Sequence, residues 1–234
     1  MTRGASGIGA RLVRAFVGNG SKVAFADVLD AEGKKLAQET GAIFHRCDIT
    51  DIAALKSAID TVGDELGPIA VLVNNAANDE RHKIDDVSVE YWDHALDVNL
   101  RPHFFAAQAV RPQMRRLGYG SIINFSSTSW RFGAFNMAAY ATAKSAIIGL
   151  TRALARGFGD DNIRVNAIEP GAVMTEKQRL MWYKTQESVD AIVQHQVIKR
   201  VLEGTDIART VLFLAADDSA MCTAQEFIVD GGWV

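Results

Sequence analysis

The sequence predicts an α/β fold in which a doubly wound parallel sheet carries helices on both faces. Three observations indicate this class. Strand-length apolar runs alternate with helical patterns along the whole chain. Two of these runs, IAVLVNN and SIINFSS, are almost wholly apolar, as is typical of strands covered on both faces. A glycine-rich turn, RGASGIG, opens the first helical pattern, which makes the fold Rossmann-like.

Each element follows from its own pattern. No repeat or linker divides the chain, so residues 1–234 are expected to form one domain. The helix in DIAALKSAIDTVGDEL should begin near Thr50, which is a good N-cap, and kinks are expected at Pro102 and Pro112. The expected strands are KVAFAD, IFHRCD, IAVLVNN, SIINFSS, IRVNAIEP and EFIVDGG. The expected helices are residues 8–17, 31–40, 51–66, 89–117, 138–158 and 205–216.

Composition excludes several classes of function. The 234 residues are 48% hydrophobic with a net charge of −3, so no basic surface indicates a nucleic acid or a membrane as partner. No apolar run resembles a signal peptide or a membrane span, and a cytoplasmic protein with a small-molecule substrate is expected. The five histidines have no metal-ligand spacing, so no metal is expected, and Cys47 and Cys222 are read as buried small apolar residues that need no pairing.

The opening turn predicts a dinucleotide site. Gly4, Gly7 and Gly9 precede a helix, where missing side chains let the backbone and the helix N-terminus approach a pyrophosphate. Asp27 ends the next strand, 18 residues after Gly9, which is close to the spacing of an acid that binds the adenosine ribose. An acid there repels a 2′-phosphate, so NAD is favoured over NADP. An ordinary strand-end role for Asp27 stays open.

A second cluster predicts the chemistry. Tyr140 and Lys144 are four residues apart and share one helical face, and Ser127 ends a strand 13 residues before Tyr140. Oxidation of an alcohol needs a base for the hydroxyl proton and an acceptor for the hydride. Lowering the pKa of a tyrosine from ~10 to ~7 requires roughly 4 kcal/mol, which the Lys144 ammonium and a positive nicotinamide ring are expected to supply.

These motifs together resemble the short-chain dehydrogenase/reductase family. The glycine turn, NNAA, VNL, Ser-(12 residues)-Tyr-xxx-Lys and EPGAV occur in that family's order over essentially the whole chain. The resemblance implies a homo-oligomer, either a dimer or a tetramer, that binds NAD. It also implies that Tyr140 is the catalytic base and that Ser127 binds the reacting oxygen. Lys144 would bind the nicotinamide ribose, and Asn99 would hold a water molecule that relays the proton.

The resemblance extends to the cofactor residues. Structural roles without cofactor binding stay open for three residues. Asn75 could cap a strand, Asn99 could hydrogen-bond to its own helix, and Thr175 could cap the helix that follows it. The residues expected to contact the cofactor are Gly4, Ser6, Gly7, Ile8, Gly9, Asp27, Asp48, Ile49, Asn75, Ala76, Ala77, Tyr140, Lys144, Pro170, Gly171, Val173 and Thr175.

Within the family, three segments are most similar to NAD-dependent sugar 1-dehydrogenases of the D-xylose type. These are NDERHKIDDVSVEYWDHALDVNLR, INFSSTSW and CTAQEFIVDGGW. The similarity implies oxidation of the anomeric C1 hydroxyl of a pentose, hexose or deoxyhexose to the lactone. Residues 171–199 are expected to form a lid over the substrate. Trp130 and Trp182 could equally pack in the core or at an interface. The expected substrate residues are Asn78, Ser129, Trp130, Gln178 and Trp182.

The chain departs from the family pattern at its start. Arg3 stands where the first glycine belongs, Ala77 replaces a glycine, and the apolar strand that should precede the turn is absent. Three explanations compete: a start that falls too late, which is favoured; neighbouring strands that close the gap; or a gap that persists and weakens stability and cofactor affinity. The alternative functions are another short-chain alcohol dehydrogenase or carbonyl reductase, or a cofactor-impaired, non-catalytic subunit.

Overall fold

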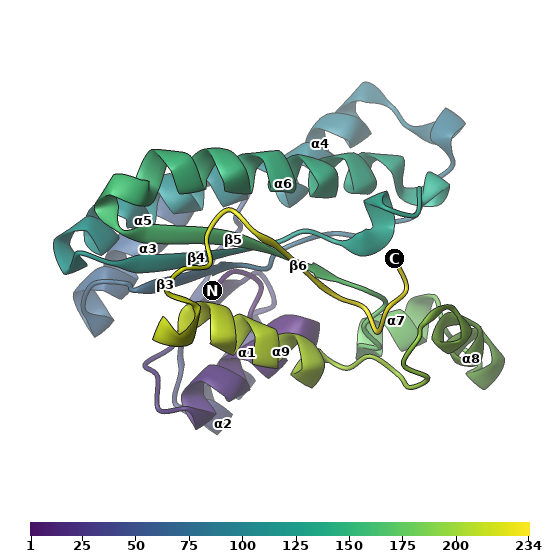
Figure 1. Ribbon diagram of the computed structural model, residues 1–234, viewed down its shortest axis with the longest axis horizontal. Helices are drawn as coiled ribbons and strands as arrows, with labels where there is room; N and C mark the ends of the chain where they lie inside the picture. Colours follow the sequence, from purple (N-terminus) through teal and green to yellow (C-terminus); the bar gives the residue numbers. More distant parts are fainter.

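The structure, a computed structural model, describes residues 1–234. Parallel strands form the middle layer and helices cover both faces (Figure 1). Every pair of neighbouring strands is parallel. The predicted α/β class, a parallel sheet flanked by helices, is therefore confirmed. The strands are β1 (Ala24–Asp27), β2 (Ile43–Arg46), β3 (Val71–Asn74), β4 (Gly120–Phe125), β5 (Ile163–Pro170) and β6 (Glu226–Val229).

Helices divide between the two faces. On one face α3, α5 and α6 pack on the strands, with α4 against α5 and α6; on the other lie α1, α2 and α9 (Figure 1). No helix combines the length and the apolarity that a bilayer crossing needs. The helices are α1 (Gly7–Gly18), α2 (Asp30–Thr40), α3 (Ile52–Leu66), α4 (Val89–Asn99), α5 (Arg101–Leu117), α6 (Ala138–Phe158), α7 (Glu176–Met181), α8 (Gln186–His195) and α9 (Gly204–Ala215).

Two helix boundaries differ from those expected. The pattern over residues 89–117 forms two helices, because Leu100 leaves the helical conformation with φ −130° and ψ −56°. Pro102 consequently lies in the first turn of α5, where its missing N–H is not needed, while Pro112 lies inside that helix. Helix α3 is capped by Asp51 and not by Thr50, since the Asp51 carboxylate accepts a hydrogen bond from the Ala54 N–H at 3.0 Å.

Alternation along β4 explains its apolar sequence. Ile122 packs with Val110 of α5 on one face, and Ile123 packs with Leu12 of α1 on the other. All four side chains are fully buried. Because successive side chains of a strand point to opposite faces, a strand between two helical layers needs apolar residues at every position.

The strands form two separate sheets. Strands β1 and β2 make one, and β3, β4, β5 and β6 make the other in that order. The first residues of the chain join them: the Met1 carbonyl accepts from the Ala26 N–H at 2.9 Å, and the Thr2 N–H donates to the Val73 carbonyl at 3.1 Å. Beyond these residues a cavity of about 310 Å³ separates β1 from β3. The explanation in which neighbouring strands close the gap is therefore wrong.

Candidate active site

One cleft of about 590 Å³ runs past the carboxyl ends of several strands. It extends from the N-terminus of α1, through the segments that follow β3 and β4, to the first turns of α6. The segment after β5 and helix α7 form its other wall. Ligands of open parallel sheets bind at this edge.

The cleft brings the three chemistry residues together. Ser127 follows β4 and caps the short 3₁₀ helix η2 (Thr128–Trp130), while Tyr140 and Lys144 lie one turn apart on α6. The Ser127 hydroxyl lies close enough to the Tyr140 phenol to act against the rise in the pKa of that phenol. The Lys144 Nζ lies 5.6 Å from the centre of the Tyr140 ring and donates to the Phe125 carbonyl at 2.6 Å. A phenol, a hydroxyl and an amine therefore face one space.

The pKa values of this cluster differ from those expected. Burial raises the pKa of Tyr140 to about 12, and the Asp79 carboxylate adds to the rise, while Ser127 and Arg3 act against it. Burial lowers the pKa of Lys144 to about 7, with a further contribution from Arg3 and opposition from Asp79. A buried amine with this pKa carries only part of a charge at neutral pH, so the joint effect expected of Lys144 and a positive nicotinamide ring on the pKa of Tyr140 stays a prediction.

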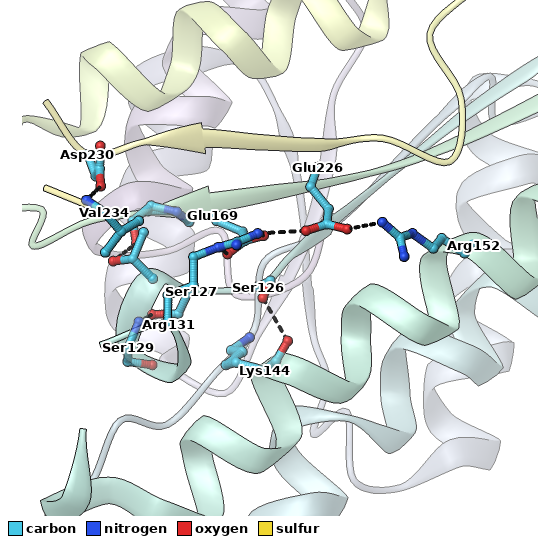
Figure 2. Close-up of polar contacts among 12 residues, drawn as sticks. Ser126, Ser127, Ser129, Arg131, Lys144, Arg152, Glu169, Glu226, Asp230 and Val234 are labelled. Carbon is cyan, nitrogen blue, oxygen red and sulfur yellow. Dashed lines mark hydrogen bonds and ion pairs between the residues drawn. The ribbon is translucent and has the colours of Figure 1, made fainter. Parts of the chain in front are cut away.

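A buried ion pair positions the Ser127 turn. Arg131, which follows η2, donates from Nε and Nη2 to the two carboxylate oxygens of the fully buried Glu169 at 2.8 and 2.9 Å. Arg131 also contacts Glu226 at 2.6 Å, and Arg152 binds the other oxygen of Glu226 at 2.6 Å. Figure 2 shows these four side chains in a row beside Ser127. The sequence analysis did not identify this ion pair. Glu169 could have indicated it, because a charged side chain inside an apolar strand requires a partner.

The end of β4 is also tied to α6. The Ser126 hydroxyl donates to the backbone carbonyl of Lys144 at 2.7 Å (Figure 2). Ser126 is buried, so this bond fixes the distance between the strand and the helix that carries Tyr140.

Asn99 and Asn78 stabilise the loop after β3. The Asn99 Oδ1 accepts from the Asn78 N–H at 2.8 Å, and its Nδ2 donates to the Ala95 carbonyl at 2.9 Å. Neither residue lines the cleft. The bond from Asn99 to the Ala95 carbonyl is the bond to its own helix that the simpler interpretation expected. The role of Asn99 in holding a water molecule stays a prediction. Asn78 does not line the cleft as a substrate residue would: its backbone N–H is bonded to Asn99 of α4, and its side chain is bonded to Glu80 of the loop.

The glycine turn has the form that a dinucleotide needs. A Cβ on Gly9 would lie 1.9 Å from the Arg3 carbonyl, and a Cβ on Gly4 would lie 2.5 Å from the Phe25 side chain. Gly7 begins α1 with φ +55°, and Ser6 caps this helix without a side-chain hydrogen bond. The first N–H groups of α1 are thus not capped by a side chain at the cleft, where a helix N-terminus binds phosphate.

Most of the predicted cofactor residues face this cleft. The Asn75 side chain donates to the Arg3 carbonyl at 3.0 Å and fixes the turn. Thr175 caps α7, as the simpler interpretation holds. It also lies against Gly7 of the glycine turn, so capping is not its only contact. The residues that line the cleft are Ser6, Gly7, Ile8, Asn75, Ala77, Tyr140, Lys144, Pro170, Gly171, Val173 and Thr175.

Six predicted cofactor residues do not line the cleft. Gly4 and Gly9 are buried beneath the turn, and Ile49 and Ala76 belong to the hydrophobic core. Asp48 is exposed, and its carboxylate accepts from the N–H and the hydroxyl of Thr50.

Asp27 is the sixth of these residues. Its carboxylate is buried and accepts from the Ala5 N–H at 2.9 Å and from the Leu29 N–H at 3.2 Å. The side chain therefore supports the glycine turn from behind, because two backbone donors next to the strand end satisfy both of its oxygens.

Arg3 crosses the cleft. It adopts φ +50°, a conformation that favours glycine, and its guanidinium donates to the Ala77 carbonyl. The guanidinium is close enough to Tyr140 and Lys144 to lower the pKa of both. The glycine turn, the α1 N-terminus, Asn75, Tyr140 and Lys144 fit a nicotinamide dinucleotide. Arg3 and Ala77 line the same cleft as these groups.

Side-chain bonds connect the loop after β3 to α7. Asp79 binds the Lys177 Nζ at 2.6 Å and the Gln178 amide at 2.5 Å. The Arg81 guanidinium lies 4.2 Å from the Trp182 ring centre and contacts the Tyr183 hydroxyl at 3.4 Å. Asp79, Arg81 and Tyr183 line the cleft. Sequence reasoning did not include Asp79 and Arg81, because their partners lie about one hundred residues away in the chain.

The predicted substrate residues divide into two groups. Ser129 and Gln178 line the cleft, and the buried Ser129 hydroxyl has no hydrogen-bond partner. Trp182 packs beneath Arg81, and Trp130 packs 4.4 Å from the Arg131 guanidinium, so neither lines the cleft. Both tryptophans are half-buried beside arginine side chains, and whether they contact the substrate stays a prediction. Other aromatic side chains, Phe132 and Trp233, line the cleft and stack at 5.2 Å.

Fold and site together define a nicotinamide-dependent oxidoreductase. The family model described as enoyl-(acyl carrier protein) reductase matches residues 4–234, and the chain belongs to the short-chain dehydrogenase/reductase family. The chain is 47% identical to a probable galactose dehydrogenase of Rhizobium meliloti, over 99% of this chain and 93% of the relative. It is 43% identical to a D-xylose 1-dehydrogenase of Caulobacter vibrioides, over 100% and 94%. It is 38% identical to a 3-alpha-(or 20-beta)-hydroxysteroid dehydrogenase of Mycobacterium tuberculosis, over 99% and 86%.

Proposed function

We propose that this protein oxidises the anomeric C1 hydroxyl of an aldose to the lactone, with NAD as the hydride acceptor. The observation that carries the proposal is the convergence of Ser127, Tyr140 and Lys144 on one cleft that also contains a glycine turn. The two relatives named for galactose and D-xylose, each aligned over nearly the whole chain, support a sugar as substrate.

The protein's own groups perform the proton transfer. The Ser127 hydroxyl donates to the reacting oxygen, and the Tyr140 oxygen accepts the proton from the C1 hydroxyl. Lys144 is held by the Phe125 carbonyl one turn from Tyr140 and binds the ribose next to the reacting ring. When bound, the oxidised dinucleotide supplies the acceptor for the C1 hydride and a positive charge that favours the Tyr140 phenolate. The α1 N-terminus would hold the pyrophosphate, and Asn75 the ribose.

Further polar groups in the cleft suit a sugar. Ser129, Asp79 and Gln178 line the cleft, and the Ser129 hydroxyl lacks a protein partner. A site whose buried polar groups are satisfied only by substrate hydroxyls rejects molecules that lack them. We also propose that residues 171–199, which contain α7 and α8, close over the sugar.

NAD is proposed over NADP on electrostatic grounds. Asp27 ends β1 beneath the glycine turn, and Glu32 lines the cleft near the start of α2. Two carboxylates near the glycine turn repel a negatively charged 2′-phosphate and so disfavour NADP. The ratio of kcat/KM for NAD to that for NADP tests this choice, and a preference for NADP would remove it.

An aldose panel tests the function. The protein is mixed with NAD and a series of pentoses, hexoses and deoxyhexoses, and NADH absorbance is followed. Reduction with at least one aldose and none with aliphatic alcohols or hydroxysteroids is expected. Turnover of a hydroxysteroid without turnover of any sugar would favour another short-chain alcohol dehydrogenase.

One observation favours a second candidate function, a non-catalytic subunit. Arg3 lies across the cleft and bonds Ala77, which obstructs the space a cofactor would use. Titration with NAD and NADH, followed by dinucleotide fluorescence, separates the candidates. The proposed enzyme binds both, whereas a protein that binds neither is the non-catalytic subunit. A homo-oligomer is also proposed, with sedimentation as its test.

A further inference from the structure

Three aromatic rings from distant parts of the chain stack beside the cleft. Trp233 follows β6, and its ring centre lies 5.2 Å from that of Phe132, with an angle of 7° between the planes. The ring of His195, the last residue of α8, lies 5.1 Å from that of Trp233 at an angle of 8°. Phe132 and Trp233 line the cleft and His195 does not. We call Phe132 and Trp233 the aromatic wall; the proposed proton transfer uses neither.

The turn that contains Ser127 also positions Phe132. The Ser129 N–H donates to the Ser127 hydroxyl at 3.2 Å, and the Ser129 carbonyl accepts from the Ala134 N–H at 3.0 Å. Phe132 lies inside the loop that this second bond closes. Its side chain is 45% exposed, so part of the ring is not covered by protein. The aromatic wall is therefore joined through a few residues to a hydroxyl of the catalytic cluster.

Asp230 fixes the backbone around Trp233. Its buried carboxylate accepts from the Gly232 N–H at 2.8 Å and from the Val234 N–H at 2.9 Å, and the second of these bonds is drawn in Figure 2. Gly231 and Gly232 have φ +73° and +82°, so the chain turns sharply before Trp233. A segment bonded in this way holds the indole in place before any substrate binds.

The same segment is joined to the proposed lid, residues 171–199. The Gly231 carbonyl accepts from the N–H groups of Val197 and Ile198, both at 2.9 Å. These two residues come just after α8, and His195 of α8 stacks on Trp233. The end of the lid therefore contacts the aromatic wall through backbone bonds and through one ring.

The cleft suits the two kinds of surface that a sugar ring presents. The C–H groups of the ring lie on its faces, and the hydroxyls surround its edge. Apolar C–H surface is stabilised when an aromatic ring replaces water, whereas a buried hydroxyl needs a hydrogen-bond partner. The aromatic wall offers the first kind of contact. Ser129 and Gln178 offer the second, and the Ser129 hydroxyl has no partner within the protein.

We propose that the aromatic wall binds one C–H face of the aldose ring and that His195 is the positioning residue that holds Trp233 for this contact. The inference rests on the proposed function, because it assumes an aldose in the cleft. The ring face takes no part in the bonds that form and break at C1. The contact is therefore equally strong before and during the reaction, and it lowers KM without changing kcat.

Steady-state kinetics with the aldose that reacts best tests the proposal. Phe132→Ala should raise KM by about tenfold while kcat stays within about twofold, because the lost contact is one of uniform binding. The Kd for NAD should not change. Phe135→Ala is the matched control, since Phe135 is a nearby ring that is 77% exposed and does not line the cleft. This control should leave KM unchanged.

Two variants test His195. His195→Ala should raise KM by about threefold, because Trp233 loses a stacked ring. His195→Phe keeps a ring at this position and should restore most of the KM of the unaltered protein. Equal rises in KM for both variants would remove His195 as the positioning residue.

The other outcomes separate the aromatic wall from the proposed function. The wall alone is overturned if the unaltered protein oxidises aldoses and Phe132→Ala leaves KM unchanged. It is also overturned if Phe135→Ala raises KM as much, or if Phe132→Ala weakens NAD binding and lowers kcat as well, since the ring would then only support the fold. If the unaltered protein oxidises no aldose, the proposed function fails, and the sugar contact fails with it.

Discussion

The Arg3 guanidinium donates a hydrogen bond to the Ala77 carbonyl across the cleft that contains Tyr140 and Lys144. Arg3 is thereby a lining residue that connects the glycine turn to the loop after β3. The same cation lowers the pKa of Lys144 and opposes the rise in that of Tyr140. One side chain at the start of the chain thus affects both access to the site and its protonation.

The first prediction concerns Arg3→Gly. Loss of a charge-assisted hydrogen bond of about 1.5–3 kcal/mol should lower the Kd for NAD by roughly tenfold or more, as measured by fluorescence titration. The free energy of unfolding should fall by less than about 2 kcal/mol, because relief of the strain at φ +50° offsets only part of the lost hydrogen bond. Arg46→Ala, at an exposed position, is the control. Weaker NAD binding by Arg3→Gly would mean that the guanidinium instead binds the pyrophosphate.

The second prediction concerns Tyr140→Phe. Removal of the phenol oxygen takes away the proton acceptor, so kcat should fall by about 10² to 10⁴-fold. The Kd for NAD should change little, because the ring and Lys144 remain. The readouts are NADH formation and cofactor titration on the same preparation. Retention of most of the activity would exclude Tyr140 as the base.

The third prediction concerns the pH dependence of stability. Folding lowers the pKa of Lys144 from 10.5 to about 7, so the unfolded chain binds more protons between these values. The contribution of Lys144 to the free energy of unfolding should therefore rise with pH, by up to about 1.4 kcal/mol per pH unit between pH 7 and pH 10. Urea unfolding of the protein and of Lys144→Met isolates this contribution. Parallel pH profiles for the two proteins would contradict the lowered pKa.

The fourth prediction concerns Arg131. Arg131→Met leaves the fully buried Glu169 without its bidentate partner, so the free energy of unfolding should fall by about 3–5 kcal/mol. Adding Glu169→Gln should recover part of this loss, because the unpaired charge is removed. Arg152→Ala breaks the more exposed contact to Glu226 and should cost less than about 1 kcal/mol. Equal losses for Arg131→Met and Arg152→Ala would show that burial of Glu169 does not matter.

Local patterns were enough to predict part of this molecule. Full burial of both Ile122 and Ile123 follows from an apolar run between two helical patterns, and the four-residue spacing of Tyr140 and Lys144 places them on one face. Both features depend on periodicity within a single element, which the sequence contains in full.

Features that depend on distant contacts were not predictable in the same way. Asp27 turns inward because the Ala5 and Leu29 N–H groups lie beside it once the chain folds. The pKa of Tyr140 depends on burial and on Asp79, which reaches it from another loop. No local pattern encodes which remote group approaches a titrating side chain.

The last prediction concerns Asp79, which has two separable effects. Its carboxylate raises the pKa of Tyr140 and fastens the loop after β3 to Lys177 and Gln178. Asp79→Asn should shift the acid limb of the kcat profile to lower pH, because the phenolate forms more easily, while the KM for the aldose rises as α7 loses its ion pair. Glu80→Gln, at the exposed neighbouring position, should change neither quantity. A rise in KM without a shift of the pH profile would assign Asp79 to the lid alone. A shift without a rise in KM would assign it to the proton chemistry alone.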